Sequence, residues 1–145
     1  MSCGKICIKF TYIYKDVSKK DQVVACMDKN FAYCKQSGVQ GTSLTSMRAT
    51  AHADGKGYDL IEVYSDAAGA EAYFRVMEAD PNAAETETVL GTLIDMTVCD
   101  IIATKEERDK APTIAMYYPE GQGPTKYVER EPTADDTKAP HFGWA

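Results

Sequence analysis

The chain has 145 residues, of which 44% are apolar and 26% are charged, and its 16 basic and 22 acidic side chains give a net charge of −6. This length and composition fit one folded domain with its own core and exclude wholesale disorder. A duplex-binding surface needs clustered Lys and Arg, so the charge balance argues against a nucleic-acid partner.

The amino terminus carries no apolar stretch long enough for a signal peptide or a membrane span. We therefore expect a soluble, cytoplasmic protein without membrane insertion. The five cysteines include no CxxC pair, and an odd count without a secretion signal favours free thiols. With only two histidines in the chain, a multi-His metal site is nearly excluded, and we expect no metal.

The first half of the chain predicts a strand, a helix and a hairpin in that order. Residues 5–15 are rich in β-branched and aromatic side chains and predict a strand. Ser18 begins a helix that ends near Gly38. Two further strands, 43–53 and 58–65, flank an Asp-Gly turn that favours a hairpin.

The next segment predicts a second helix and a fourth strand. Asp66 is placed to cap a helix over residues 67–79, which Pro81 ends, and a short helical turn follows. Residues 93–103 predict the last strand. The order β-α-β-β-α-β over residues 5–103 is typical of a ferredoxin-like α+β fold, with a four-stranded antiparallel sheet and both helices on one face.

The composition changes after residue 104, so we divide the chain into a domain at 1–104 and a C-terminal extension at 105–145. Residues 113–118 predict a short strand, and the rest of the extension is rich in Pro, Gly and charge. An ordered arm with so little local structure must be docked, and we expect it to lie on a partner subunit.

Alternation along the strands sorts their residues into two faces. We assign one apolar set to the helices: Ile6, Ile8, Phe10, Tyr12, Met47, Ala49, Ala51, Ile61, Val63, Ile94, Met96 and Val98. The opposite set mixes polar and apolar side chains: Cys7, Lys9, Thr11, Ile13, Ser46, Arg48, Thr50, His52, Leu60, Glu62, Tyr64, Asp95, Thr97, Cys99 and Ile101. Either this face is solvated, or a second copy covers it and encloses a semi-polar cavity.

The run Glu62-Val63-Tyr64-Ser65-Asp66, with the alanine-rich segment 67–73 after it, resembles a stretch of the antibiotic biosynthesis monooxygenase-like (ABM) domains. These domains belong to the dimeric α+β barrel superfamily, and the order of elements agrees over residues 5–103. The resemblance implies a homodimer whose sheets pack face to face and a cavity for a small aromatic or apolar ligand. Family members include quinol and polyketide monooxygenases and haem-degrading enzymes.

The cofactor prediction depends on the positions at which this chain differs from the haem-degrading members of the family. Tyr73 stands where the haem-degrading members have their axial histidine, and Tyr64 holds the position of a pocket tryptophan. The first strand has Thr11 or Phe10 near the position of that branch's asparagine. Haem is therefore disfavoured, and we expect no cofactor.

Two residues are candidates for catalysis, each with a structural alternative. Glu62 is a candidate base for a phenol or quinol, with Lys9 or Arg48 stabilising the anion, but Glu62 and Lys9 could equally form a structural ion pair. His52 is a second candidate base, or a surface histidine beside the hairpin turn. The predicted ligand-binding residues are Lys9, Thr11, Arg48, Tyr64 and Tyr73.

The function implied by the resemblance is cofactor-independent oxygenation of a quinol or polyketide-like molecule in the sheet cavity. Two alternatives stay open. One is a non-catalytic dimerisation or ligand-carrying module within a larger assembly. The other is an isomerase or cyclase of a polyketide-like ligand, because a fold does not select among such activities.

Overall fold

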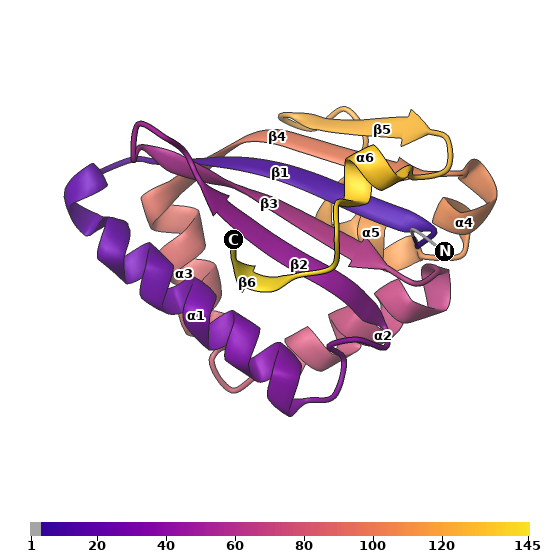
Figure 1. Cartoon of the computed structure of the whole chain (residues 1–145), viewed down its shortest axis with the longest axis horizontal. Helices are drawn as coiled ribbons and strands as arrows, with labels where there is room; N and C mark the ends of the chain where they lie inside the picture. Colours follow the sequence, from indigo (N-terminus) through magenta and orange to yellow (C-terminus); the bar gives the residue numbers. More distant parts are fainter. Residues whose placement is uncertain (1–3) are drawn as a thin grey trace.

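The computed structural model describes residues 4–145, which form one mixed six-stranded sheet of order β5-β4-β1-β3-β2-β6 (Figure 1). The strands are β1 (Ile6–Tyr14), β2 (Leu44–Ala51), β3 (Gly57–Tyr64), β4 (Ile94–Ala103), β5 (Thr125–Glu129) and β6 (Phe142–Trp144). The α+β fold is confirmed. The prediction of a four-stranded antiparallel sheet holds only for the centre of the sheet, β4-β1-β3-β2. Strands β5 and β6 pair in parallel with its two edges, so the whole sheet is mixed.

The helical segments are η1 (Val17–Lys19), α1 (Lys20–Gln36), α2 (Ala67–Glu78), α3 (Ala83–Leu93), α4 (Lys105–Asp109), α5 (Pro112–Tyr117) and α6 (Ala134–Thr137). Helices α1, α2, α3 and α5 lie on one side of the sheet (Figure 1). As expected, Asp66 caps α2, where its carboxylate accepts a hydrogen bond from the Gly69 N–H. None of these helices is long and apolar enough to cross a membrane within residues 4–145.

The register of β3 overturns the predicted faces of that strand. Glu62 pairs with Ile8, and Leu60 pairs with Phe10, so both β3 side chains face the helices. Ile61 and Val63 therefore face the opposite side, contrary to the prediction. The alternation misleads here because both faces of β3 are apolar: Val63 packs with Cys7 and Ile102 in a second, smaller cluster.

The predicted faces of β4 are partly wrong, because the β1–β4 ladder has a register shift between Thr11 and Tyr12. Such an irregularity changes the side to which later residues point. Before it, Met96 faces the helices as predicted; after it, Cys99 and Ile101 face them too, whereas both were predicted on the opposite face. The central helix-facing layer consequently runs from Tyr14 and Ile94 through Phe10 to Ile6.

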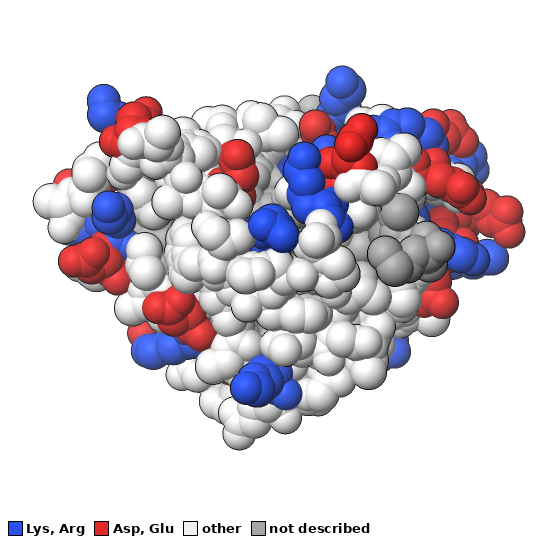
Figure 2. All heavy atoms as spheres, viewed as in Figure 1, with Lys and Arg blue, Asp and Glu red and all other residues white. Residues whose placement is uncertain are grey.

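The C-terminal extension docks on the sheet of its own chain. Strand β5 pairs with β4, and β6 pairs with β2. Residues 113–118 contribute to a helix, α5, rather than to the predicted strand. The short helix α6 lies against the face opposite the other helices, where Asp136 accepts a 2.9 Å bond from the Lys9 ammonium group. The charged side chains crowd the end of the molecule that carries α4 and α6, and the middle over β2 and β6 is largely uncharged (Figure 2).

Candidate functional site

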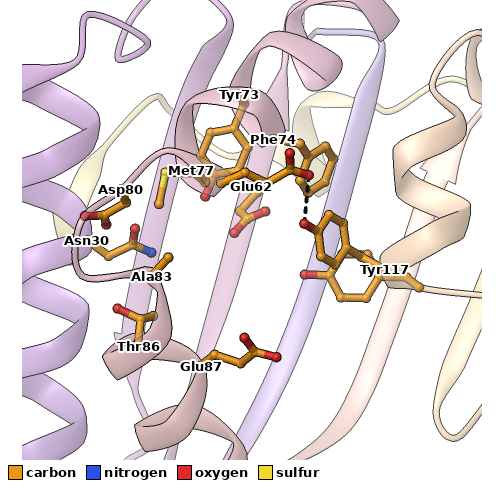
Figure 3. A pocket seen from close by; sticks show the side chains of 12 residues that line it. Asn30, Glu62, Tyr73, Phe74, Met77, Asp80, Ala83, Thr86, Glu87 and Tyr117 are labelled. Carbon is orange, nitrogen blue, oxygen red and sulfur yellow. Dashed lines mark hydrogen bonds between the residues drawn. The ribbon is translucent and has the colours of Figure 1, made fainter.

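A cavity of about 330 Å³ lies between the sheet and its helix layer. Figure 3 shows Glu62 in the middle of the side chains that line it. The lining residues are Asn30, Glu62, Tyr73, Phe74, Met77, Glu78, Asp80, Ala83, Thr86, Glu87, Tyr117 and Tyr118. The volume is at the lower end of the range for small-molecule sites, and the aromatic and apolar side chains with few buried polar groups are typical of such sites.

Glu62 is the buried carboxyl group of the cavity, with 6% of its surface exposed. The Tyr64 hydroxyl donates a 2.6 Å hydrogen bond to its Oε1. Burial raises the pKa of Glu62 to about 7, and the hydrogen bond from Tyr64 acts in the opposite direction. A carboxyl group with this pKa exchanges its proton near neutral pH, which is the property required of a general acid or base.

Tyrosine hydroxyl groups supply the other polar atoms near Glu62. Burial is the main cause that raises the pKa values of Tyr12, Tyr64, Tyr73 and Tyr118, so these phenols stay neutral donors. Tyr73 is 5% exposed and lines the cavity, and within residues 4–145 nothing pairs with its hydroxyl. This hydroxyl is available to a bound molecule.

One wall of the cavity comes from α5, which belongs to the C-terminal extension. Tyr117 and Tyr118 form this wall, and the Tyr117 ring stacks on Phe74 with centroids 5.4 Å apart. Glu71 on α2 accepts hydrogen bonds from the Thr113 N–H and hydroxyl, which fix the start of α5. The chain beyond residue 104 is therefore part of the site.

The helix layer contributes three further carboxyl groups to the lining of the cavity. Glu78 closes α2, Asp80 lies in the turn that follows, and Glu87 comes from α3. Asn30 reaches in from α1 (Figure 3). Across residues 4–145, no group of three or more His, Cys, Asp or Glu side chains is arranged to hold a metal ion.

The predicted site residues do not form one site, because they lie on both faces of the sheet and at the β2–β3 hairpin. Glu62, Tyr64 and Tyr73 come together on the helix side of the sheet. Lys9, Thr11 and Arg48 lie on the other face, as their ladder partners Ile61 and Asp59 do. The predicted ion pair between Lys9 and Glu62 is wrong, because Lys9 binds Asp136 and the two side chains point to opposite faces.

The remaining predicted residue, His52, lies at the hairpin between β2 and β3. Its Nε2 is 2.9 Å from Asp59 Oδ1, and it does not line the Glu62 cavity. Thr11 donates to the same Asp59 carboxylate. The Arg48 guanidinium donates to the Ala139 carbonyl in the extension. None of these contacts brings a cation to Glu62.

Sequence reasoning missed the cavity residues on α3 and α5. The aromatic pair Tyr117-Tyr118 was visible, but it was interpreted as part of a strand. The preceding Pro112 was the available signal, because proline is favoured in the first turn of a helix. Asp80 and Glu87 belong to no motif or alternating pattern in the sequence that would predict a place in a cavity.

A second cavity, of about 520 Å³, lies between the β2–β3 edge and residues 134–140. Its polar lining is already engaged: the Ser46 hydroxyl bonds the His141 backbone, and the Thr45 hydroxyl donates to the Val63 carbonyl. Among the residues from Gly4 onward that the structure describes, its lining includes neither a buried ionisable group nor an aromatic ring. The Glu62 cavity is therefore the better candidate site.

No protein-family model and no curated protein matches this chain. Among solved structures, MupZ from Pseudomonas fluorescens superposes with a TM-score of 0.57 at 16% identity, over 90% of this chain and 93% of that one. An antibiotic biosynthesis monooxygenase homologue from Bacteroides thetaiotaomicron superposes with a TM-score of 0.50 at 13% identity, over 69% and 88% of the two chains. The chain therefore has the fold of an antibiotic biosynthesis monooxygenase-like domain.

Proposed function

We propose that the chain binds a small phenolic or quinol-type molecule in the Glu62 cavity and that Glu62 removes its acidic proton. The observation that carries this proposal is a buried carboxyl group, with a pKa raised to about 7, in a cavity lined by aromatic rings. A phenol fits because its ring matches the aromatic lining and its hydroxyl can bond a buried base, Glu62.

The oxygenation that we propose needs no group beyond substrate and molecular oxygen. Glu62 takes the phenolic proton, and the ring carbon of the phenolate forms a bond to O2. Loss of water then leaves a quinone: one oxygen atom enters the product as a carbonyl, the other leaves as water, and the substrate supplies all the electrons. We assign the Tyr73 hydroxyl, whose side chain lines the cavity, the role of donating a hydrogen bond to the phenolate, as an oxyanion donor does.

We propose further that two copies associate through the sheet face opposite the helices. This face carries the partly buried apolar side chains Ile13, Ile61 and Val98, and α6 covers part of it. Light scattering after size exclusion should give twice the chain mass of 15.9 kDa. An Ile61→Glu variant should then be monomeric, and a monomeric wild type would refute the association.

Oxygen consumption tests the chemistry. Wild type, Glu62→Gln and His52→Ala are compared on a panel of naphthols, anthrones and hydroquinones. We expect uptake above the protein-free rate for the wild type and His52→Ala, and a loss of at least about 100-fold for Glu62→Gln. Uptake equal to the protein-free rate would refute the oxygenase, and unchanged uptake in Glu62→Gln would refute Glu62 as its base. Binding without uptake would favour a ligand-carrying role.

A further inference from the structure

We propose that the ligand of the Glu62 cavity is an aromatic molecule that carries an ammonium group. This inference rests on the proposed function only in placing the ligand in that cavity. It concerns the part of the lining that the helices supply, and it names the charge of the part of the ligand that lies beside it.

The lining of the cavity is one-sided in charge. It includes four carboxyl groups and no Lys, Arg or His side chain. Three of the carboxylates come from the helix layer: Glu78 ends α2, Asp80 lies in the turn after it, and Glu87 lies on α3. Glu78 and Glu87 are exposed, and Asp80 is buried. On the neighbouring surface of α1, Lys29 is already bound to Glu85 at 3.2 Å. No cation of the lining offsets this charge.

Two further polar groups of the lining are available to an occupant. The Tyr73 hydroxyl, on a side chain that is 5% exposed, has no partner within residues 4–145. The Oδ1 atom of Asn30 is buried without a hydrogen bond. A buried polar atom left without a partner costs stability, so we expect Asn30 Oδ1 to gain a partner from a bound molecule. The Tyr73 hydroxyl can bond the same molecule, because its side chain lines the cavity.

The aromatic rings next to the carboxylates suit a cation as well. Phe74 and Tyr117 stack with an interplanar angle of 24°, and the Tyr117 hydroxyl donates to Glu78 at 2.8 Å. An ammonium group beside aromatic rings and carboxylates is stabilised by both. A ligand that carries a carboxylate beside these side chains would be repelled by like charge. The net charge of −6 on the chain also favours cationic over anionic ligands.

Three phenols of similar size and different charge test the inference: tyramine, 4-ethylphenol and 3-(4-hydroxyphenyl)propanoate. Their affinities are measured by ligand-observed NMR titration at low and high salt. We expect tyramine to bind at least about threefold more tightly than 4-ethylphenol, the propanoate to bind most weakly, and the preference to shrink with salt.

Charge-neutralising variants locate the effect. Glu78→Gln combined with Glu87→Gln should reduce the ratio of the tyramine affinity to the 4-ethylphenol affinity to about one. Glu129→Gln, at the exposed end of β5 and outside the cavity lining, is the control and should keep the preference. Equal affinities of tyramine and 4-ethylphenol, or a preference that survives the double variant, would overturn the inference.

The two proposals fail in different ways. If 4-ethylphenol binds as well as tyramine and Glu62→Gln abolishes oxygen uptake, the ammonium inference is wrong and the proposed function stands. If tyramine is preferred and no phenol is oxidised, the proposed oxygenation is wrong and the ammonium site stands. If none of the three phenols binds, both are wrong.

Discussion

The Tyr64 hydroxyl donates a 2.6 Å hydrogen bond to Oε1 of Glu62, two residues earlier on β3. Residues two apart on a strand point to the same face, so this contact follows directly from the strand. The hydrogen bond stabilises the charged form of Glu62, whereas burial destabilises it more strongly, and the result is a pKa of about 7. Burial and the hydrogen bond from Tyr64 together set the proton affinity of the Glu62 carboxyl group.

Removing this hydrogen bond should raise the pKa of Glu62 further. In Tyr64→Phe we expect the pKa to rise by about one unit, because only desolvation remains. Carbon-13 NMR titration of the Glu62 carboxyl group measures it, with Glu62→Gln identifying the signal. An activity that depends on the ionised base should shift its midpoint to higher pH by the same amount.

Tyr58→Phe is the matched control for that experiment. The Tyr58 hydroxyl is buried without a hydrogen bond, and the ring packs against Tyr12 and Trp144. Its removal should leave the Glu62 titration unchanged and should not lower stability, because an unsatisfied buried hydroxyl is lost. An unchanged Glu62 pKa in Tyr64→Phe, or an equal shift in Tyr58→Phe, would contradict the proposed effect of Tyr64.

The raised pKa of Glu62 should make folding stability depend on pH. Folded Glu62 holds its proton up to about pH 7, and an unfolded glutamate loses it near its ordinary pKa of 4.5. Between these values the folded state binds more protons, so the free energy of unfolding falls as pH rises. The shift corresponds to at most about 3 kcal/mol, fully expressed above pH 7.

Denaturant unfolding of the wild type and Glu62→Gln at several pH values between 5 and 8 isolates this effect. The stability of the wild type relative to the variant should decline over that interval. Parallel stability curves for the two proteins would show that Glu62 titrates normally.

The sequence correctly predicts those features of the fold that depend only on residues close together in the chain. The Asp66 cap and the Asp-Gly turn at residues 54–55 depend on neighbouring residues only, and both elements formed where they were expected. The central strand β3 is different. It buries Leu60 on one face and Val63 on the other, so alternation alone could not decide which face carries Glu62.

The remaining errors come from contacts that are distant in sequence. The register shift in the β1–β4 ladder moved Cys99 to the helix side, and no turn residue marks it. Residues 113–118 have strand-forming side chains, yet Ile114 is fully buried as part of a helix that Glu71 anchors through Thr113. Tertiary packing overrode local preference at both positions.

Two glycines in helices should respond oppositely to alanine. A Cβ atom at Gly69 would lie 2.5 Å from the Ser65 hydroxyl oxygen and 2.9 Å from the Ser43 carbonyl oxygen, so Gly69→Ala should destabilise the fold by about 1–3 kcal/mol. A Cβ at Gly91, in α3, meets nothing within 4 Å, and Gly91→Ala should stabilise by about 0.5–1 kcal/mol. Thermal unfolding compares them, and equal changes would show that α2 does not approach the Ser43 loop closely.

The last prediction concerns the attachment of the extension to the sheet. Asp136 is buried, and it binds the Arg130 guanidinium at 2.6 and 2.9 Å and the Lys9 ammonium at 2.9 Å. The hydrogen bond from Arg130 is the main cause that holds the pKa of Asp136 well below its usual range. Its stabilisation is therefore present above the unfolded value near pH 4 and is lost as pH falls below it.

Asp136→Asn should lower the stability of the fold by about 1–3 kcal/mol at neutral pH, because two cations lose their shared partner. Asp135→Asn, an exposed neighbour on α6, is the matched control and should change stability little. Arg130 directly follows β5, in which the Tyr127 hydroxyl donates to the Tyr118 carbonyl beside the cavity. Loosening this anchor should therefore also weaken binding of 4-ethylphenol; equal stability of the two variants would show that the ion network does not hold the extension.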